Sequence, residues 1–126
     1  MLPKQHRITK KQDYDRLFQK GRAIPSRICM IRWMHNELHV PRMGIIVSNK
    51  VSKKATIRNK IKRQYRAIIG KKIDTLPFVD FIIVAKNKVV NTPYPEIEAD
   101  CLRLLKKIDE TFYHSSHQAL SKDPVA

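Results

Sequence analysis

Cysteine, glycine and long apolar runs are scarce in this sequence. Its 126 residues include two cysteines, Cys29 and Cys101, three glycines and one tryptophan. The cysteines have no CxxC spacing, which argues against a disulfide framework and a structural zinc site. No apolar run approaches the roughly 20 residues that span a bilayer, and the first residues, MLPKQHRITKK, lack the apolar segment of a signal peptide. We therefore expect a cytoplasmic protein without membrane contact.

Acidic residues are also few, and they are unevenly placed. Eleven Asp and Glu accompany 26 Lys and Arg, which gives a formal charge of +15. Residues 1–72 carry 20 basic and 3 acidic side chains, whereas residues 73–126 carry 6 and 8. Such an excess repels itself unless a polyanion neutralises it, so nucleic acid is the favoured partner. No linker separates the halves, and we expect one RNA-binding domain over residues 1–114 and a flexible tail over residues 115–126.

The hydrophobic pattern predicts helices packed on a small sheet. Thr9 and Gln12 resemble a capping box and start a helix over residues 9–20. Strand-favouring runs follow at 27–35 and 43–48, and we expect them to be adjacent and antiparallel. A basic helix over 55–69, a central strand over 78–85 and a last helix over 95–113 complete the order. The fold class is α+β, as a two-layer sandwich.

Residues 48–72 are the most informative segment, with ten basic side chains and no acidic one. In the helix expected over 55–69, the isoleucines follow one stripe, and a polar, mainly basic arc of about 140° lies opposite most of it. That arc contains Arg58, Asn59, Lys62, Arg63 and Arg66. Guanidinium, ammonium and amide groups held in a fixed geometry suit RNA phosphates and 2′-hydroxyls. The segment therefore predicts a helix that packs by one side and binds RNA by the other.

This segment resembles the signature of the bacterial ribonuclease P protein family. The resemblance rests on Arg58-Asn59-Lys60-x-Lys62-Arg63-x-x-Arg66, although Lys60 stands where the family usually has Arg. It extends over nearly the whole chain, because Tyr14, Phe18 and Gly21 match the family's aromatic-x-x-x-Phe-x-x-Gly pattern. The resemblance implies a mixed sheet of four strands with three helices and a left-handed βαβ crossover, which the general right-handed rule does not predict.

The resemblance also implies a division of labour between two surfaces. The basic helix and the loop before it would bind the catalytic RNA subunit, and a cleft between the sheet and the first helix would receive the single-stranded 5′ leader of precursor tRNA. The candidates for the cleft are Tyr14, Phe18 and Trp33. The candidates for RNA binding are Lys50, Lys53, Lys54, Arg58, Asn59, Lys60, Lys62, Arg63 and Arg66.

A protein active site is not evident in the sequence. The acidic residues are scattered, and the pairs His35 with His39 and His114 with His117 lack a clear third metal ligand. We therefore expect no catalytic residue, no metal or other cofactor held by the protein and no obligate protein partner. The family resemblance assigns Mg²⁺-dependent hydrolysis to the RNA subunit. Two alternatives stay open: another RNA-binding protein, of ribosomal type, and a stand-alone metal-dependent nuclease that uses His35, His39 and nearby acidic residues.

Overall fold

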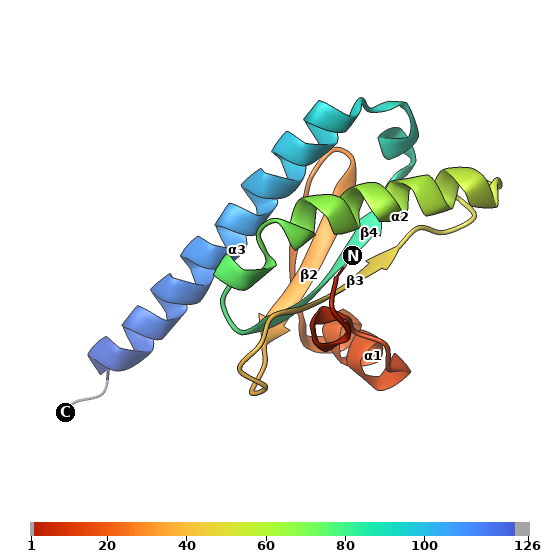
Figure 1. Ribbon diagram of the computed structural model, residues 1–126. Helices are drawn as coiled ribbons and strands as arrows, with labels where there is room; N and C mark the ends of the chain where they lie inside the picture. Colours follow the sequence, from red (N-terminus) through yellow and green to blue (C-terminus); the bar gives the residue numbers. More distant parts are fainter. Residues whose placement is uncertain (1, 123–126) are drawn as a thin grey trace.

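The computed structural model describes residues 2–122, with the side chains of residues 2–113. Within that range lie three α-helices, four strands and three short 3₁₀ helices. In chain order they are η1 (Lys4–His6), α1 (Lys11–Lys20), β1 (Arg22–Pro25), β2 (Cys29–His35), β3 (Arg42–Ile46), α2 (Ala55–Gly70), η2 (Ile73–Thr75), β4 (Val79–Ala85), η3 (Asn87–Asn91) and α3 (Tyr94–Lys122). Figure 1 shows α2 and α3 in front of the sheet and α1 behind it. The predicted α+β class is confirmed, and α1 adds cover on the second face of the sheet.

The sheet is mixed and has the order β1-β2-β4-β3. β2 is antiparallel to both β1 and β4, whereas β3 is parallel to β4. With β3 and β4 pointing up and α2 in front, the chain steps left from β3 to β4, so the crossover is left-handed (Figure 1). The expected pairing of the 27–35 and 43–48 runs is wrong, because β4 is inserted between β2 and β3. The β4 run is apolar on both faces, and a central position in the sheet buries both of them.

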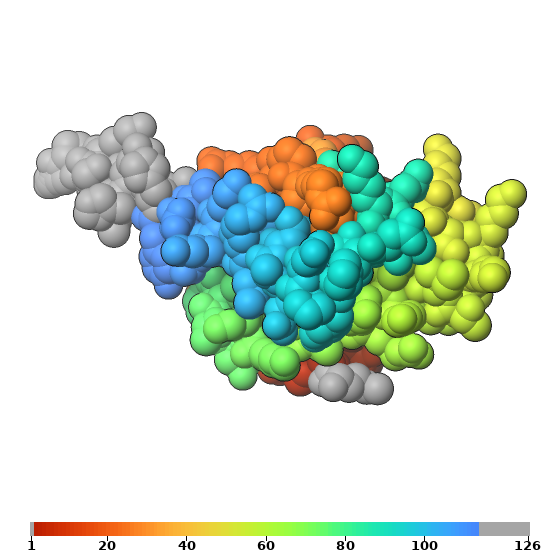
Figure 2. All heavy atoms as spheres, turned by 90° about the horizontal axis from the view of Figure 1, so that it is seen from above, coloured from red at the N-terminus to blue at the C-terminus, as the bar shows by residue number. Residues whose placement is uncertain are grey.

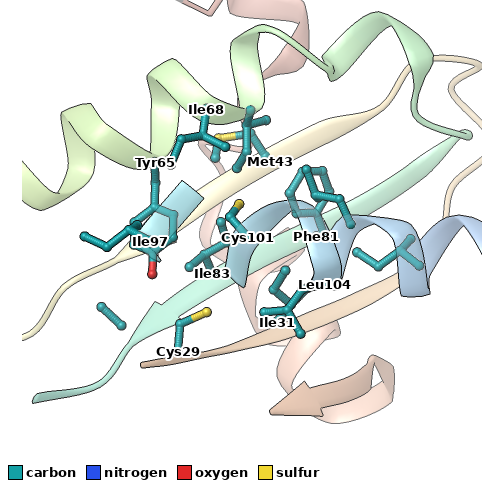
Figure 3. Packing of buried hydrophobic residues seen from close by; sticks show 14 of the residues in the cluster. Cys29, Ile31, Met43, Tyr65, Ile68, Phe81, Ile83, Ile97, Cys101 and Leu104 are labelled. Carbon is teal, nitrogen blue, oxygen red and sulfur yellow. The ribbon is translucent and has the colours of Figure 1, made fainter. Parts of the chain in front are cut away.

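Two apolar clusters lie on opposite faces of the sheet. The main core joins the sheet to α2 and α3. Figure 3 shows Ile31 and Phe81 near Leu104 of α3, and Tyr65 of α2 beside Ile97 of α3. The second cluster lies under α1 and is built on Leu17, Ile8 and Ile82. Alternation along β4 sends Phe81 to the main core and Ile82 to the second cluster, which explains why nearly every residue of β4 is buried.

The segment before α1 covers the open edge of β3. Leu2 is buried in the main core and Ile8 in the second cluster, so the chain passes from one face of the sheet to the other. Arg7 forms a parallel bridge with Met43, and the amide of Ile8 donates to the Met43 carbonyl at 2.9 Å. Covering an edge strand hinders its pairing with another chain.

Two helix boundaries differ from the sequence prediction. The capping box is wrong: α1 begins at Lys11 after Lys10, without a side-chain cap, because the preceding residues are extended against β3. The last helix runs to Lys122, beyond the predicted end at 113. Flexibility of the tail stays a prediction, and residues 123–126 lie outside the described part of the chain. No helix among the described residues is long and apolar enough to cross a membrane.

Candidate nucleic-acid interface

α2 packs by one stripe and leaves its cations at the surface. Ile61, Tyr65, Ile68 and Ile69 are its buried residues, and they attach it to the main core. The opposite side and the loop after β3 form what we call the basic α2 surface, which extends along an open flank of the molecule (Figure 2). Its members are Lys50, Lys53, Lys54, Arg58, Asn59, Lys62, Arg63 and Arg66, all exposed except the half-buried Arg58 and Lys62.

The cations of this surface have no acidic partner among the described side chains. The ion pairs among the described side chains are all formed by residues outside the basic α2 surface. No Asp or Glu occurs between Glu37 and Asp74 in the sequence, which removes the local source of counter-charge. Ordinary protein surfaces mix both signs. An uncompensated cluster of this kind provides a strong positive potential for a polyanion.

The start of α2 adds to that potential. The helix has no acidic residue in its first turn and no side-chain cap on its N-cap residue, Lys54. The positive end of the helix dipole therefore lies beside the loop lysines. Arg58 donates from Nη1 to the carbonyl of Ser52 at 2.9 Å, and Ser52 Oγ accepts the amide of Lys54 at 3.2 Å. Arg58 thus stabilises the loop in addition to carrying charge.

Lys60 lies apart from the rest of the predicted RNA-binding set. It lines a groove on the η3 side of α2, with Ile57 and Gln64 of the same helix and Val89 and Val90 of η3. Its exposed ammonium group therefore faces away from the centre of the basic α2 surface.

The two aromatic residues of α1 differ in exposure. Phe18 is 44% exposed. Tyr14 is half-buried in the second cluster, where its hydroxyl donates to the Ile8 carbonyl at 3.2 Å and its ring lies over Gly44. Burial raises the pKa of Tyr14, and the charge of Arg66 partly offsets that rise. The charge of Arg66, on the basic α2 surface, therefore acts on Tyr14 of α1.

The prediction for Trp33 needs correction. Its side chain is 1% exposed and belongs to the main core, on the α2 and α3 side of the sheet. The cleft candidates of α1 lie on the opposite side. Neighbouring residues of a strand point to opposite faces, so Arg32 rather than Trp33 shares the face with α1.

A partly buried ion pair on the α1 face was missed by the sequence reasoning. Arg42 of β3 donates from Nε to Asp80 Oδ1 at 2.8 Å and from Nη2 to Oδ2 at 2.6 Å. Asn36 donates to the same carboxylate at 2.9 Å, and Asp13 of α1 accepts from Arg42 at 3.4 Å. The network joins α1, β3, β4 and the loop after β2. Asp80 offered a signal, because a lone carboxylate in an apolar strand requires a buried partner.

The histidines that could serve a nuclease make aromatic contacts. His35 stacks on Trp33, with centroids 5.6 Å apart, and lies 4.6 Å from the Phe112 ring. Burial and the charge of Arg22 lower the pKa of His35. His39 meets the edge of Phe78. Among the described residues, no group of three or more His, Cys, Asp or Glu could hold a metal ion. The side chains of His114 and His117 lie outside the described part of the chain.

Comparison with known proteins gives a consistent picture. A family model for ribonuclease P matches residues 2–109. The chain is 32% identical over 108 residues to the ribonuclease P protein component of Syntrophomonas wolfei, covering 85% of this chain and 90% of that protein. It is 33% identical over 109 residues to the one from Geobacillus sp. strain WCH70, with 84% and 92% covered.

Solved structures of the same kind share the fold. The RNase P protein of Staphylococcus aureus superposes with a TM-score of 0.74 at 30% identity, over 82% of this chain and 94% of that one. The RNase P protein of Thermotoga maritima gives a TM-score of 0.74 at 26% identity, over 81% and 96%. With the family model matching most of its length, this chain belongs to the ribonuclease P protein family.

Proposed function

We propose that this chain, as the protein subunit of ribonuclease P, binds the catalytic RNA through the basic α2 surface and the 5′ leader of precursor tRNA beside α1. The subunit thereby assists endonucleolytic removal of the leader, in the bacterial cytoplasm. The observation that carries the proposal is that the α2 cations have no acidic partner among the side chains the structure describes. Buried isoleucines hold those cations in a fixed arrangement, which suits a folded RNA of defined shape.

In this proposal the RNA subunit performs the Mg²⁺-dependent hydrolysis. The protein supplies fixed cations between two polyanions, the catalytic RNA and its substrate. Fixed cations lower the repulsion between the two and release counterions, so less Mg²⁺ is needed for the same affinity.

The proposed leader contact depends on α1 more than on β2. Phe18 presents nearly half of its surface to solvent, and an exposed aromatic ring can stack on a base of any identity. Such stacking contributes about 1 to 3 kcal/mol per base. Tyr14 offers only part of its ring because it packs against Gly44.

Reconstitution tests this function. The purified chain is added to its cognate catalytic RNA at low Mg²⁺, and cleavage of precursor tRNA is followed. We expect strong stimulation over the RNA alone and no cleavage by the protein alone. Cleavage without the RNA would instead establish the stand-alone nuclease. Absence of stimulation, together with equal affinity for a ribosomal RNA fragment, would favour the ribosomal type of RNA-binding protein.

A further inference from the structure

Arg32 of β2 closes the C-terminal end of α1. Its Nε donates to the Leu17 carbonyl at 3.1 Å, and its Nη2 donates to the carbonyls of Phe18 at 3.0 Å and Gly21 at 3.2 Å. The last carbonyls of a helix have no partner within the helix and carry its negative dipole end. The Leu17 carbonyl also accepts the Gly21 amide at 2.9 Å. One guanidinium group therefore donates to three backbone acceptors and places a positive charge where the helix favours it.

The same side chain contacts the exposed aromatic residue of α1. The Arg32 guanidinium carbon lies 5.8 Å from the centre of the Phe18 ring, within the range of a cation–π contact. Phe18 is 44% exposed, so much of its ring faces solvent. Arg32 is half-buried on the sheet face that α1 covers. Backbone and ring of Phe18 are thus both held by one residue of β2.

We propose that Arg32 is a positioning residue that fixes the end of α1 and the orientation of Phe18, and so shapes the surface that receives the leader. This inference rests on the proposed function. The planar guanidinium is essential to it, because three carbonyls at the helix end are reached from two nitrogen atoms in one plane. An ammonium group is a single point of charge and cannot reproduce that fork.

Three variants of the reconstituted holoenzyme test the proposal: Arg32→Met, Arg32→Lys and Phe18→Ala. The measurement is the affinity for precursor tRNA with a leader, divided by the affinity for the same tRNA without one. We expect each variant to lower this ratio about fivefold to tenfold, the lower end of the range for one base stack. Arg32→Lys should lower the ratio as much as Arg32→Met does, although lysine retains the charge. Full recovery with Lys would show that charge alone is used and would overturn the proposal.

A double-mutant cycle gives the second readout. If Arg32 acts by holding Phe18, then Phe18→Ala lowers the ratio much less in the Arg32→Met background than in the wild type. Independent, multiplicative losses would contradict the proposal. Affinity for the catalytic RNA should stay within about twofold in every variant, because the basic α2 surface is untouched. A large loss of that affinity in Arg32→Lys would also overturn it, since the residue would then support the whole fold.

The matched control is Arg22→Met. Arg22 is also an arginine over an aromatic ring, 5.6 Å from the centre of Trp33. Arg22 and Trp33 are cross-strand partners in the pairing of β1 with β2, and both lie on the face of the sheet away from α1. Arg22→Met should leave the ratio unchanged.

The two proposals can fail separately. A wild-type holoenzyme without preference for the leader would refute the proposed function itself. A wild-type preference that survives Arg32→Met would refute only the role of Arg32.

Discussion

Two groups of arginines in this protein are used in opposite ways. On the α1 face, Arg32 and Arg42 are half-buried, and their donors are taken by carbonyls and carboxylates of the protein. On α2, Arg63 and Arg66 are exposed and form no ion pair among the described side chains. Within the first group, Arg42 joins β3 to β4 through Asp80, and Arg32 holds the end of α1. The second group increases self-repulsion in the free protein and gains its partner when RNA binds.

The difference also separates stability from binding. Removal of Arg42 leaves the Asp80 carboxylate without its cation inside the protein, which costs several kcal/mol. Removal of an exposed cation without a partner costs little in the free protein. Variants of the two groups should therefore fail in different assays, and this contrast orders the expected effects.

The largest effect is expected for Arg42→Met. It leaves Asp80 without its bidentate partner at a site where the carboxylate is only 5% exposed. We expect a loss of about 3 kcal/mol in the free energy of unfolding, measured by urea denaturation. Arg42→Met combined with Asp80→Leu should recover much of that loss. A loss below about 1 kcal/mol in Arg42→Met would show that the ion pair between Arg42 and Asp80 contributes little to stability.

The next effect concerns the contact between Tyr14 and Gly44. A Cβ at Gly44 would overlap the Tyr14 hydroxyl and lie 2.8 Å from its Cζ. Gly44→Ala should therefore displace Tyr14 and cost about 1 to 3 kcal/mol of stability. In a Tyr14→Ala background the same change should cost little. Equal costs in both backgrounds would show that the strain arises elsewhere.

A smaller effect distinguishes two cations of α2 itself. Arg63→Ala should weaken binding of the catalytic RNA and lower the salt slope of the affinity by about one phosphate contact, with stability unchanged. Lys60→Ala should change the affinity less, because Lys60 lies in the groove beside η3. Filter binding over a range of salt concentrations measures both. An equal or larger effect of Lys60 would extend the interface toward η3.

The smallest effect is a pH dependence at His35. Burial and Arg22 lower its pKa in the folded state, so the unfolded chain binds a proton more readily. The contribution of the neutral ring is complete above the unfolded pKa, about 6.5, and is lost as pH falls through that value toward the lower folded pKa. The Tm of the wild type should therefore decrease more between pH 7 and pH 5 than the Tm of His35→Phe. Identical decreases would show that the acid sensitivity arises at other groups.

The sequence predicted α2 better than it predicted the α1 face. The stripe of Ile61, Tyr65 and Ile68 is a local pattern, so the helix limits and its basic side follow from spacing alone. Which strands pair is decided by contacts far apart in the chain, and the placement of β4 between β2 and β3 was missed for that reason. Trp33 and Arg32 alternate on one strand, and no local signal says which of them faces α1.

The salt dependence of binding tests the central claim most directly. The decisive variant combines Lys62→Gln, Arg63→Gln and Arg66→Gln. A plot of log affinity for the catalytic RNA against log salt concentration has a negative slope, and in this variant the slope should be less steep than in the wild type by about 2 to 3. The free energy of unfolding should stay the same within about 0.5 kcal/mol. An unchanged slope would contradict the assignment of the basic α2 surface to RNA.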